Sequence, residues 1–454
     1  MQKKVCLIYP RFHYPSGDPP LGILYVAAYL KKEINDLDLR FIDTTFNPTL
    51  NFVIKRLEEF RPGIVGIYMD TLMYKNAIRI AAIAKKFSAE VVVGGPHPTI
   101  LPDSVIRNKF IDAIIQGEAE QSFTEYVREF YKNKRFEKIP GLWYKNNHKI
   151  IKNNTRKNLI DLDSLPLPDL GLLDMNRYIN NWFHFGYMNN IRGTSIIGSR
   201  GCTFNCSYCQ PTLIKMFGNK IRRRSSRNMI AELKSLRQEY NINAFHLQDD
   251  TSTSDREWIL DFSKKLIQSK LNFSWSCNSR ADTLSIEMVK WMKRSGLKEI
   301  RIGIESISPR IRNDLYSKNL SLAQINKSIN LIKKNDLMAF GYFMLGAPGE
   351  TEQEIKDTIK FASSSRLDVA TFSIATPIPG TLLYQKIFNN QDMNEFNDFN
   401  YYKVTRNFSS IPRIRLKYYK KLAYLRFYLH PKRIKNSLIE IHHIRKILNK
   451  LKRF

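Results

Sequence analysis

The sequence RGCTFNCSYC, residues 200–209, carries three of the five cysteines of this 454-residue chain, in the spacing CxxxCxxC. Residues 195–199, Ser-Ile-Ile-Gly-Ser, come just before it and are typical of a short buried strand. The cysteines therefore lie on a loop that leaves the carboxyl end of a strand, where α/β folds keep their chemistry. We expect the rest of the chain to be organised around this loop.

Thiolates this close together can hold an iron–sulfur cluster, which usually takes four cysteines. The loop supplies only Cys202, Cys206 and Cys209, so one iron stays open to an outside ligand and the cluster becomes reactive. A structural zinc site is the alternative. Zinc needs a closed set of four ligands, and the sequence has neither a second cysteine pair nor a histidine at finger spacing. The spacing therefore favours the cluster.

The motif resembles that of the radical S-adenosylmethionine (SAM) superfamily, in which the amino and carboxylate groups of SAM chelate the open iron. The resemblance implies a 4Fe–4S cluster on the three cysteines and cleavage of SAM to a 5′-deoxyadenosyl radical. The residue before the third cysteine is usually aromatic in that family and lies near the adenine. Here it is Tyr208.

Regularly spaced apolar segments accompany the cysteine loop, and each is followed by a helical pattern. The resulting six βα units, between residues 190 and 381, suit the partial (β/α)6 barrel that the resemblance implies. The predicted strands are residues 195–200, 244–248, 273–279, 299–304, 339–345 and 369–375.

The resemblance also implies that residues at the carboxyl ends of these strands contact SAM. Asp249 would support the SAM amino group, Glu305 lies in a GIES sequence like that of the family, and Gly346 lies in the segment lining the adenine side. Arg280 ends another strand and suits a carboxylate. Each signal is weak alone, because a strand-end acid can simply cap the next helix, as we expect of Glu350.

The two remaining cysteines are expected in the core. Cys6 lies inside an apolar strand. Cys277 could reach the barrel interior as a hydrogen donor, but a buried inert thiol is the more common case.

The first 140 residues alternate strand and helix. Continuous apolar strands with helical crossovers predict a parallel sheet covered on both faces, as in the Rossmann-like doubly wound fold. The predicted strands are residues 5–9, 39–43, 64–68, 91–95 and 112–117, and the helices are residues 22–32, 51–60, 76–87 and 120–131.

The carboxyl ends of these strands are rich in glycine and proline, around Gly22, Gly94, Gly95, His97 and Gly117. Glycine lets the backbone approach a flat ligand closely. No G-x-G-x-x-G follows the first strand, which argues against a dinucleotide. Placed before a radical SAM core, these segments look like the cobalamin-binding domain of cobalamin-dependent radical SAM enzymes, which implies that the five residues line a cobalamin site.

One departure from the cobalamin-domain pattern concerns the axial ligand. Many such domains supply a histidine through D-x-H-x-x-G, but residues 69–73 contain none. Cobalamin would therefore be held without histidine ligation. His97 could instead cap its loop, and the domain could have kept the fold without the cofactor.

Residues 141–189 read as a hairpin around Asn146-Asn147-His148 and a proline-stiffened linker. Residues 382–454 form a basic region with 17 Lys/Arg and 4 Asp/Glu, in a chain whose net charge is +30. Residues 434–451 can form a basic amphipathic helix that would suit an anionic membrane surface. The alternative is a solvated face packed on the barrel. Nucleic acid is not expected. The RNA-modifying methylthiotransferases, another branch of the radical SAM superfamily, carry an additional cysteine triad in the amino-terminal domain and an RNA-binding β-barrel at the carboxyl end, and neither is visible in this sequence.

The sequence thus predicts an α/β protein. It consists of a Rossmann-like cobalamin-binding domain (1–140), a hairpin and linker (141–189), a radical SAM partial barrel (190–381) and a basic, mostly helical region (382–454). The implied activity is cobalamin-dependent methyl transfer from SAM to an unactivated carbon of a small-molecule or lipid-like substrate.

The implied cofactors are the 4Fe–4S cluster, SAM and cobalamin. The reducing partner would be a flavodoxin or ferredoxin. The cysteine usage and the amino terminus favour a reduced cytoplasm, with peripheral membrane contact. The alternatives are radical oxidation or cyclisation without methyl transfer, and a non-catalytic iron–sulfur or zinc protein.

Overall fold

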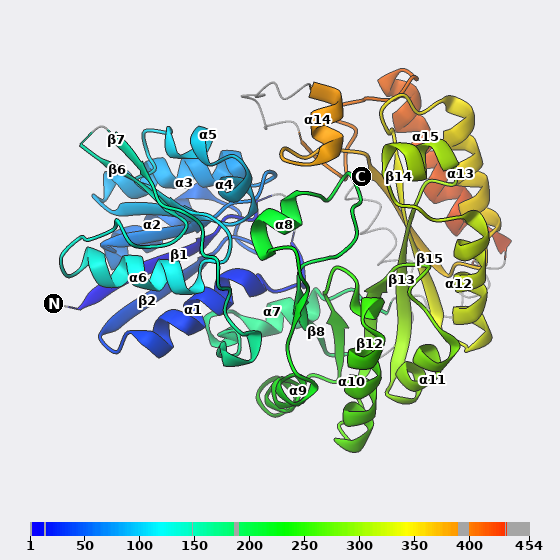
Figure 1. The fold of residues 1–454 in the computed structure, drawn as a ribbon, viewed down its shortest axis with the longest axis horizontal. Coiled ribbons are helices and arrows are strands. Elements are labelled where there is room, and N and C mark those ends of the chain that lie inside the picture. Colours follow the sequence, from blue (N-terminus) through cyan, green and yellow to red (C-terminus); the bar gives the residue numbers. More distant parts are fainter. Residues whose placement is uncertain are drawn as a thin grey trace. The chain divides into compact units, whose positions relative to one another are not determined.

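The computed structural model describes residues 2–12, 15–147, 149–185, 190–388, 399–431 and 433. The chain forms two compact units (Figure 1). The first runs to Trp182 and also takes up residues 211–222. The second contains residues 183–210 and most of the chain from Arg223 onward.

The first unit contains a parallel sheet with the strand order β2-β1-β3-β4-β5. Each predicted strand and helix of this region is confirmed within a few residues. The strands are β1 (Lys3–Tyr9), β2 (Leu37–Asp43), β3 (Ile64–Tyr68), β4 (Glu90–Gly94) and β5 (Ala113–Ile115). The helices are α1 (Leu21–Glu33), α2 (Leu50–Phe60), α3 (Tyr74–Lys86), α6 (Glu120–Phe130) and the short α4 (Pro96–Ile100) and α5 (Pro102–Ile106).

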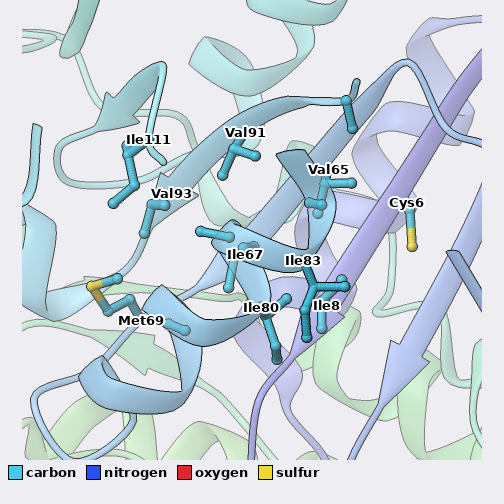
Figure 2. Packing of buried hydrophobic residues seen from close by; sticks show 14 of the residues in the cluster. Cys6, Ile8, Val65, Ile67, Met69, Ile80, Ile83, Val91, Val93 and Ile111 are labelled. Atoms are coloured by element: carbon cyan, nitrogen blue, oxygen red, sulfur yellow. The ribbon is translucent and has the colours of Figure 1, made fainter. Parts of the chain in front are cut away.

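Alternating side chains of these strands enter two separate cores, one on each face of the sheet. Cys6 and Ile8 of β1 join Val65, Val91 and Val93 on one face (Figure 2). Val5 and Leu7 join the core on the other face. Cys6 is fully buried and burial raises the pKa of its thiol, which confirms its predicted place in the core.

The sheet of the first unit continues beyond the predicted domain boundary at residue 140. Strands β6 (Leu142–Asn146) and β7 (Lys149–Lys152) form the expected hairpin, and β6 pairs antiparallel with β5. The hairpin thereby covers the open edge that β5 would otherwise present. The linker packs on the same unit through α7 (Met175–Asn180), where the Tyr178 hydroxyl donates to Asp43 at 2.6 Å.

The second unit contains a six-stranded parallel sheet with the order β15-β14-β13-β12-β11-β8. Its predicted strands are confirmed as β8 (Gly193–Ile196), β11 (Ala244–Leu247), β12 (Ser274–Ser279), β13 (Leu297–Glu305), β14 (Met338–Leu345) and β15 (Val369–Ile374). The helices between them are α9 (Ser226–Tyr240), α10 (Arg256–Gln268), α11 (Ile286–Arg294), α12 (Leu322–Lys334) and α13 (Glu352–Ser364).

Short elements complete the two units. They are β9 (Ser199–Arg200), α8 (Thr212–Phe217), β10 (Arg222–Arg223), 3-10 turns at Leu162–Ser164, Leu170–Leu172 and Ser252–Ser254, and a π-helical turn at Arg310–Leu315.

The helices of the second unit cover one face of its sheet, and aromatic side chains from strands and helices pack together there. Phe245 of β11 and Trp275 of β12 stack at 5.8 Å, and Phe262 of α10 packs against both. Cys277 follows on β12 and is fully buried, with its neighbours Leu247 and Ile300 in register. This supports the prediction of a buried thiol rather than a hydrogen donor.

Beyond residue 381 the described chain forms α14 (Leu382–Phe388) and α15 (Arg413–Tyr428). Helix α15 packs on the barrel, where the Tyr424 hydroxyl accepts a hydrogen bond from the Phe372 backbone N–H at 3.1 Å. The predicted helix at 434–451 lies outside the described residues. Within the described ranges, no helix has the length and apolar character needed to cross a membrane.

Candidate active site

The cysteine loop follows β9 and is shaped by its own hydrogen bonds. The backbone N–H groups of Cys209 and Gln210 both donate to the Cys206 carbonyl, at 3.0 and 2.9 Å. All three thiols are free, with Cys206 buried and Cys202 and Cys209 half-buried. Burial raises the pKa of the Cys209 thiol, and the charge of Cys206 adds to that rise. One short loop thus supplies the three thiols that a shared iron–sulfur cluster would need.

Contacts outside the loop fix its position in the barrel. The Ser207 N–H donates to the Tyr316 carbonyl at 2.9 Å, and its hydroxyl donates to the Leu315 carbonyl at 2.6 Å. The Leu383 N–H in turn donates to the Ser207 carbonyl at 2.8 Å. The loop is therefore held by the π-helical turn on one side and by α14 on the other.

Asp249 holds the strand that enters the loop. Its carboxylate, which is 1% exposed, accepts hydrogen bonds from the Gly198 N–H at 2.7 Å, the Ser199 N–H at 3.0 Å and the Ser199 hydroxyl at 2.7 Å. Burial raises the pKa of this carboxyl, and the hydrogen bonds oppose that rise. Both oxygens are thus engaged within the chain, and contact with the SAM amino group stays a prediction.

Glu305 forms a buried polar cluster with Lys318 and Tyr208. Its carboxylate lies 2.7 Å from the Lys318 ammonium, and the Tyr208 hydroxyl donates to the same oxygen at 3.2 Å. Gly303 makes room for this pair, because a Cβ there would stand 2.5 Å from the Glu305 carboxylate and 2.7 Å from Nζ of Lys318. The structure thus brings together two predicted SAM residues, Tyr208 and Glu305, and adds a lysine that sequence reasoning missed.

Arg280 lies directly against the cysteine loop. Its guanidinium stands 3.9 Å from the ring centroid of Phe204, and Nη1 is 3.5 Å from the Cys206 sulfur. Hydrogen bonds to Asp282 at 3.0 Å and to the Lys318 carbonyl at 2.8 Å hold it there. A cation beside a cluster sulfur offsets negative charge and tunes the reduction potential. The prediction that Arg280 also binds the SAM carboxylate stays open.

The turn after β14 contains Gly346 and corrects one expectation. Glu350 does not cap the next helix, because Thr351 is the N-cap of α13 and forms a capping box with Glu354. The Glu350 carboxylate instead accepts the N–H groups of Gly346 at 2.7 Å and Ala347 at 3.0 Å. Gly346 has φ +83°, and a Cβ there would meet Leu416 of α15 at 2.6 Å. The turn is thus shaped by its hydrogen bonds to the buried Glu350 carboxylate and by its close packing against Leu416 of α15.

Polar side chains line the face of the sheet opposite the helices. One row across the neighbouring strands is Ser195, His246, Ser276 and Glu299. The next row contains Asn278 and Arg301, with the Phe340 ring against the Arg301 guanidinium. Nδ1 of His246 lies 2.7 Å from the Ser276 hydroxyl, and Arg301 donates to Glu299 at 2.6 Å. Sequence reasoning missed these residues. Polar residues at every second position of buried strands are the signal that indicates them.

In the first unit, the loops at the carboxyl ends of β3, β4 and β5 are tied together. The Thr99 hydroxyl donates to the Gly95 carbonyl at 2.8 Å and accepts the Gly117 N–H at 2.9 Å. Gly95 and Gly117 have φ of +114° and +74°, which side chains rarely adopt. No atom lies within 4 Å of where a Cβ would stand on Gly22 or Gly94, so the backbone is open there to a close ligand.

His97 joins the loop after β4 to the loop after β3. Its ring is buried, its Nδ1 lies 3.0 Å from the Thr71 hydroxyl, and it packs against Tyr74 at 4.8 Å. Burial lowers the pKa of His97 to about 3, so the ring is neutral at physiological pH. This geometry suits a residue that braces its loop. Direct contact with cobalamin stays a prediction.

A polar cavity of about 190 Å³ lies within the first unit beside Gly117. It is lined by the end of β5, by residues 155–160 of the linker and by α8. Segment 211–222 follows the cysteine loop directly and is held in this unit by an ion pair between Arg222 and Glu118.

The residues present fit both the iron–sulfur cluster and the cobalamin that the sequence suggests. The second unit offers three neighbouring thiols with a cation beside one of them, and the first offers glycine loops with open space for a flat ligand. Among the described residues, no three or more His, Cys, Asp or Glu side chains are arranged to hold a single metal ion.

Comparison with known proteins divides the chain in the same way. The Radical SAM superfamily model matches residues 196–362, and the B12 binding domain model matches residues 15–127. The uncharacterized methyltransferase PH0819 of Pyrococcus horikoshii is 34% identical over 437 residues, covering 93% of this chain and 91% of that protein. The anaerobic magnesium-protoporphyrin IX monomethyl ester cyclase of Rubrivivax gelatinosus is 26% identical over 88% of this chain and 72% of the cyclase.

Among solved structures, the radical SAM methyltransferase TsrM of Kitasatospora setae, with cobalamin and a 4Fe–4S cluster bound, matches with a TM-score of 0.71. The match has 16% identity and covers 86% of this chain and 75% of that chain, so the likeness concerns the fold. The match to PH0819 over nearly the whole length of both proteins decides the family. The chain belongs to the radical SAM superfamily, in the group that carries a B12 binding domain ahead of the radical SAM domain.

Proposed function

We propose that the protein is a cobalamin-dependent enzyme that transfers a methyl group from SAM to an unactivated carbon of a small molecule. The proposal rests on one combination in a single chain, the CxxxCxxC loop together with the glycine-lined crevice of B12-binding type. The relative PH0819, which is named a methyltransferase, is 34% identical and matches 93% of this chain, which includes both regions. When bound, the cluster and SAM supply a 5′-deoxyadenosyl radical, and cobalamin supplies the methyl group.

The chain's own residues hold and orient these groups. Cys202, Cys206 and Cys209 bind the cluster. Asp249 keeps the entering strand in place, and Arg280 offsets charge at Cys206. Tyr208, Glu305 and Gly346 form the SAM side of the site, with the carboxylate of Glu305 held ready by Lys318.

Cobalamin is held without a histidine ligand in this proposal. Gly22, Gly94, Gly95 and Gly117 let the backbone approach the corrin, and His97 braces the loops that carry them. Support comes from the positive φ angles and from the open space at Gly22 and Gly94.

The polar face of the barrel sheet indicates which class of substrate the site would accept. Asn278 and Tyr342 are half-buried on that face, with the Tyr342 hydroxyl 3.4 Å from the Asn278 amide oxygen. Such a surface offers hydrogen-bonding groups to a ligand, so it favours a small molecule with polar groups of its own. A lipid-like substrate would have to present its polar head here.

The remaining partners follow from the chemistry and the charge. A flavodoxin or ferredoxin supplies the electron for SAM cleavage in a reduced cytoplasm. The basic carboxyl-terminal region contacts an anionic membrane surface.

A second candidate function is radical ring formation or oxidation without methyl transfer. The observation in its favour is the 26% identity to the magnesium-protoporphyrin ester cyclase over 88% of this chain. Labelled methyl groups separate the two candidates.

The test uses the anaerobically reconstituted full-length protein with cobalamin, reductant and SAM carrying a ¹³C-methyl group. A panel of polar metabolites is added, and products are analysed by mass spectrometry. Methyl transfer predicts a product that carries the label, together with 5′-deoxyadenosine and S-adenosylhomocysteine. A product that forms with 5′-deoxyadenosine but without the label would establish the second candidate instead.

A further inference from the structure

Helix α15 has two apolar faces, and the barrel uses only one of them. Leu416, Ala423 and Phe427 are buried, and Tyr424 bonds the Phe372 backbone. The alternative of a region packed on the barrel, which the sequence also allows, therefore holds for this face. An apolar face that the fold leaves exposed indicates a surface for a partner.

The second face is an exposed apolar row. Its side chains are Ile414, Tyr418, Leu425 and Leu429, which are 77, 58, 50 and 62% exposed, with the half-buried Leu422 between them. At 3.6 residues per turn these positions fall within a sector of about 80°. We call this row the outer face of α15.

Cations flank the outer face on both sides. Arg413, Lys417 and Lys421 lie along one border, and Arg415 and Arg426 lie along the other, all exposed. Arg415 is partly neutralised by an ion pair with Glu352 of α13. Residues 399–431 contain no Asp or Glu. The helix thus combines an apolar row with a basic border, as helices lying in a membrane interface do.

Three candidates could cover the outer face of α15: residues 434–454, a second copy of the chain, or an anionic membrane surface. Charge distinguishes between them. Residues 434–454 contain six Lys/Arg and one Glu, so this segment would bring further positive charge against the cations of α15. A second copy packed through the same face would oppose identical cations in the same way. An anionic, apolar surface matches both features at once.

We propose that the outer face of α15 docks on a membrane surface rich in anionic lipid. The apolar row enters the headgroup region, and the flanking cations face the lipid phosphates. The proposal rests on the membrane contact proposed above and names the element that makes it, but it does not depend on methyl transfer. Each cation near such a surface strengthens attraction, and salt weakens it.

The test is co-sedimentation of the full-length reconstituted protein with vesicles. Vesicles that contain phosphatidylglycerol are compared with pure phosphatidylcholine, at low and at high salt. We expect binding to the anionic vesicles only, with release at high salt.

Two variants address the outer face. Ile414→Ser/Leu425→Ser removes apolar surface that would enter the headgroup region, and Lys417→Glu/Lys421→Glu/Arg426→Glu reverses three cations that would face the phosphates. Each variant should weaken binding about tenfold or more. The matched controls change the same chemistry elsewhere on the unit. They are Ile286→Ser/Leu322→Ser, at other exposed apolar positions, and Lys290→Glu/Lys298→Glu/Lys327→Glu, at exposed lysines. Both controls should bind as the wild type does.

Other outcomes overturn the proposal in distinguishable ways. If a chain ending at residue 433 loses binding while the α15 variants keep it, the membrane contact stands but α15 does not make it. Equal sedimentation with neutral and anionic vesicles, or none with either, rejects both the anionic membrane contact and the role of α15 in it. A dimer that Ile414→Ser/Leu425→Ser dissociates, or RNA retention lost in the same variants without vesicle binding, would identify a different partner.

Discussion

Glu305 has φ +64° and keeps its carboxylate buried between Lys318 and Tyr208. Removing one partner of a buried ion pair leaves the other charge uncompensated. Glu305→Gln should therefore lower the free energy of unfolding by about 3 kcal/mol. The double variant Glu305→Gln/Lys318→Met should lose less than Glu305→Gln alone, because it removes both charges.

Urea denaturation under anaerobic conditions measures both variants. A double variant less stable than either single variant would contradict the account, since the two residues would then act independently.

Glu350 provides a prediction with a definite pH dependence. Burial raises the pKa of its carboxyl from about 4.5 to about 7. The unfolded chain releases this proton first, so the group makes the protein less stable as pH rises from about 4.5 to 7. Glu350→Gln keeps an acceptor for Gly346 and Ala347 and should be more stable than the wild type at pH 8, by up to about 3 kcal/mol.

Glu354 is the matched control for Glu350, because its pKa is shifted the other way. Burial acts to raise its pKa, but hydrogen bonds, the strongest of them from Arg310, outweigh burial and lower the pKa to about 2. Its contribution is present above pH 4.5 and is lost as pH falls, so Glu354→Gln should be less stable than the wild type at pH 8. Thermal denaturation from pH 4 to 8 compares the two variants, and equal signs at pH 8 would contradict the assignment.

Single residues differ in how far sequence predicts them. Cys202, Cys206 and Cys209 are recognisable because cluster binding depends on their spacing in one loop. The role of Glu350 was wrongly predicted, because its partners depend on the shape of the turn rather than on its neighbours in sequence. Lys318 was missed for a similar reason, since it meets Glu305 only across a loop that periodicity does not define.

At the scale of elements, the end of α13 depends on a residue that lies far along the chain. The last turn of α13 has no basic residue of its own. Arg433, which is 6% exposed, donates to the carbonyls of Ser363, Ser365 and Leu367 at 2.8, 2.9 and 3.0 Å. Its guanidinium also stacks on Phe427 at 3.8 Å. A cation at a helix carboxyl end is stabilising.

Arg433→Met should therefore destabilise the protein by about 3 kcal/mol, since several buried carbonyls lose their donor. Arg433→Lys should recover part of the loss. Arg415→Met is the control, because Arg415 is exposed and pairs only at the surface with Glu352, so little change is expected. Denaturant titration checks this, and equal effects of Arg433→Met and Arg415→Met would contradict the capping role.

Strands and helices were predicted well because local patterns carry them. Continuous apolar runs identify the strands of the first parallel sheet, and regularly spaced strand patterns followed by helical ones identify those of the second. The crossovers then leave few topologies. The antiparallel pairing of β6 with β5 was not predicted, because it joins residues that no local pattern connects. For the same reason the boundary at residue 140 falls inside the first unit, which reaches Trp182.

At the scale of the whole molecule, the chain contains glycine-rich loops at the carboxyl ends of the strands in one unit and the cysteine loop in the other, as its family implies. The two units can be tested separately within one protein. The cysteines belong to the second unit and the glycine loops to the first. A change that removes iron should therefore leave corrinoid binding in place.

The most direct measurement uses the full-length protein reconstituted without oxygen with iron, sulfide and cobalamin, and then incubated with methyl-labelled SAM and reductant. The account predicts one 4Fe–4S cluster and one corrinoid per chain, 5′-deoxyadenosine, and labelled methyl on the corrinoid. Cys202→Ala/Cys206→Ala/Cys209→Ala should lose the iron and the 5′-deoxyadenosine but retain corrinoid. Stoichiometric zinc in place of iron, or a wild-type protein that cleaves SAM yet retains no corrinoid, would contradict it.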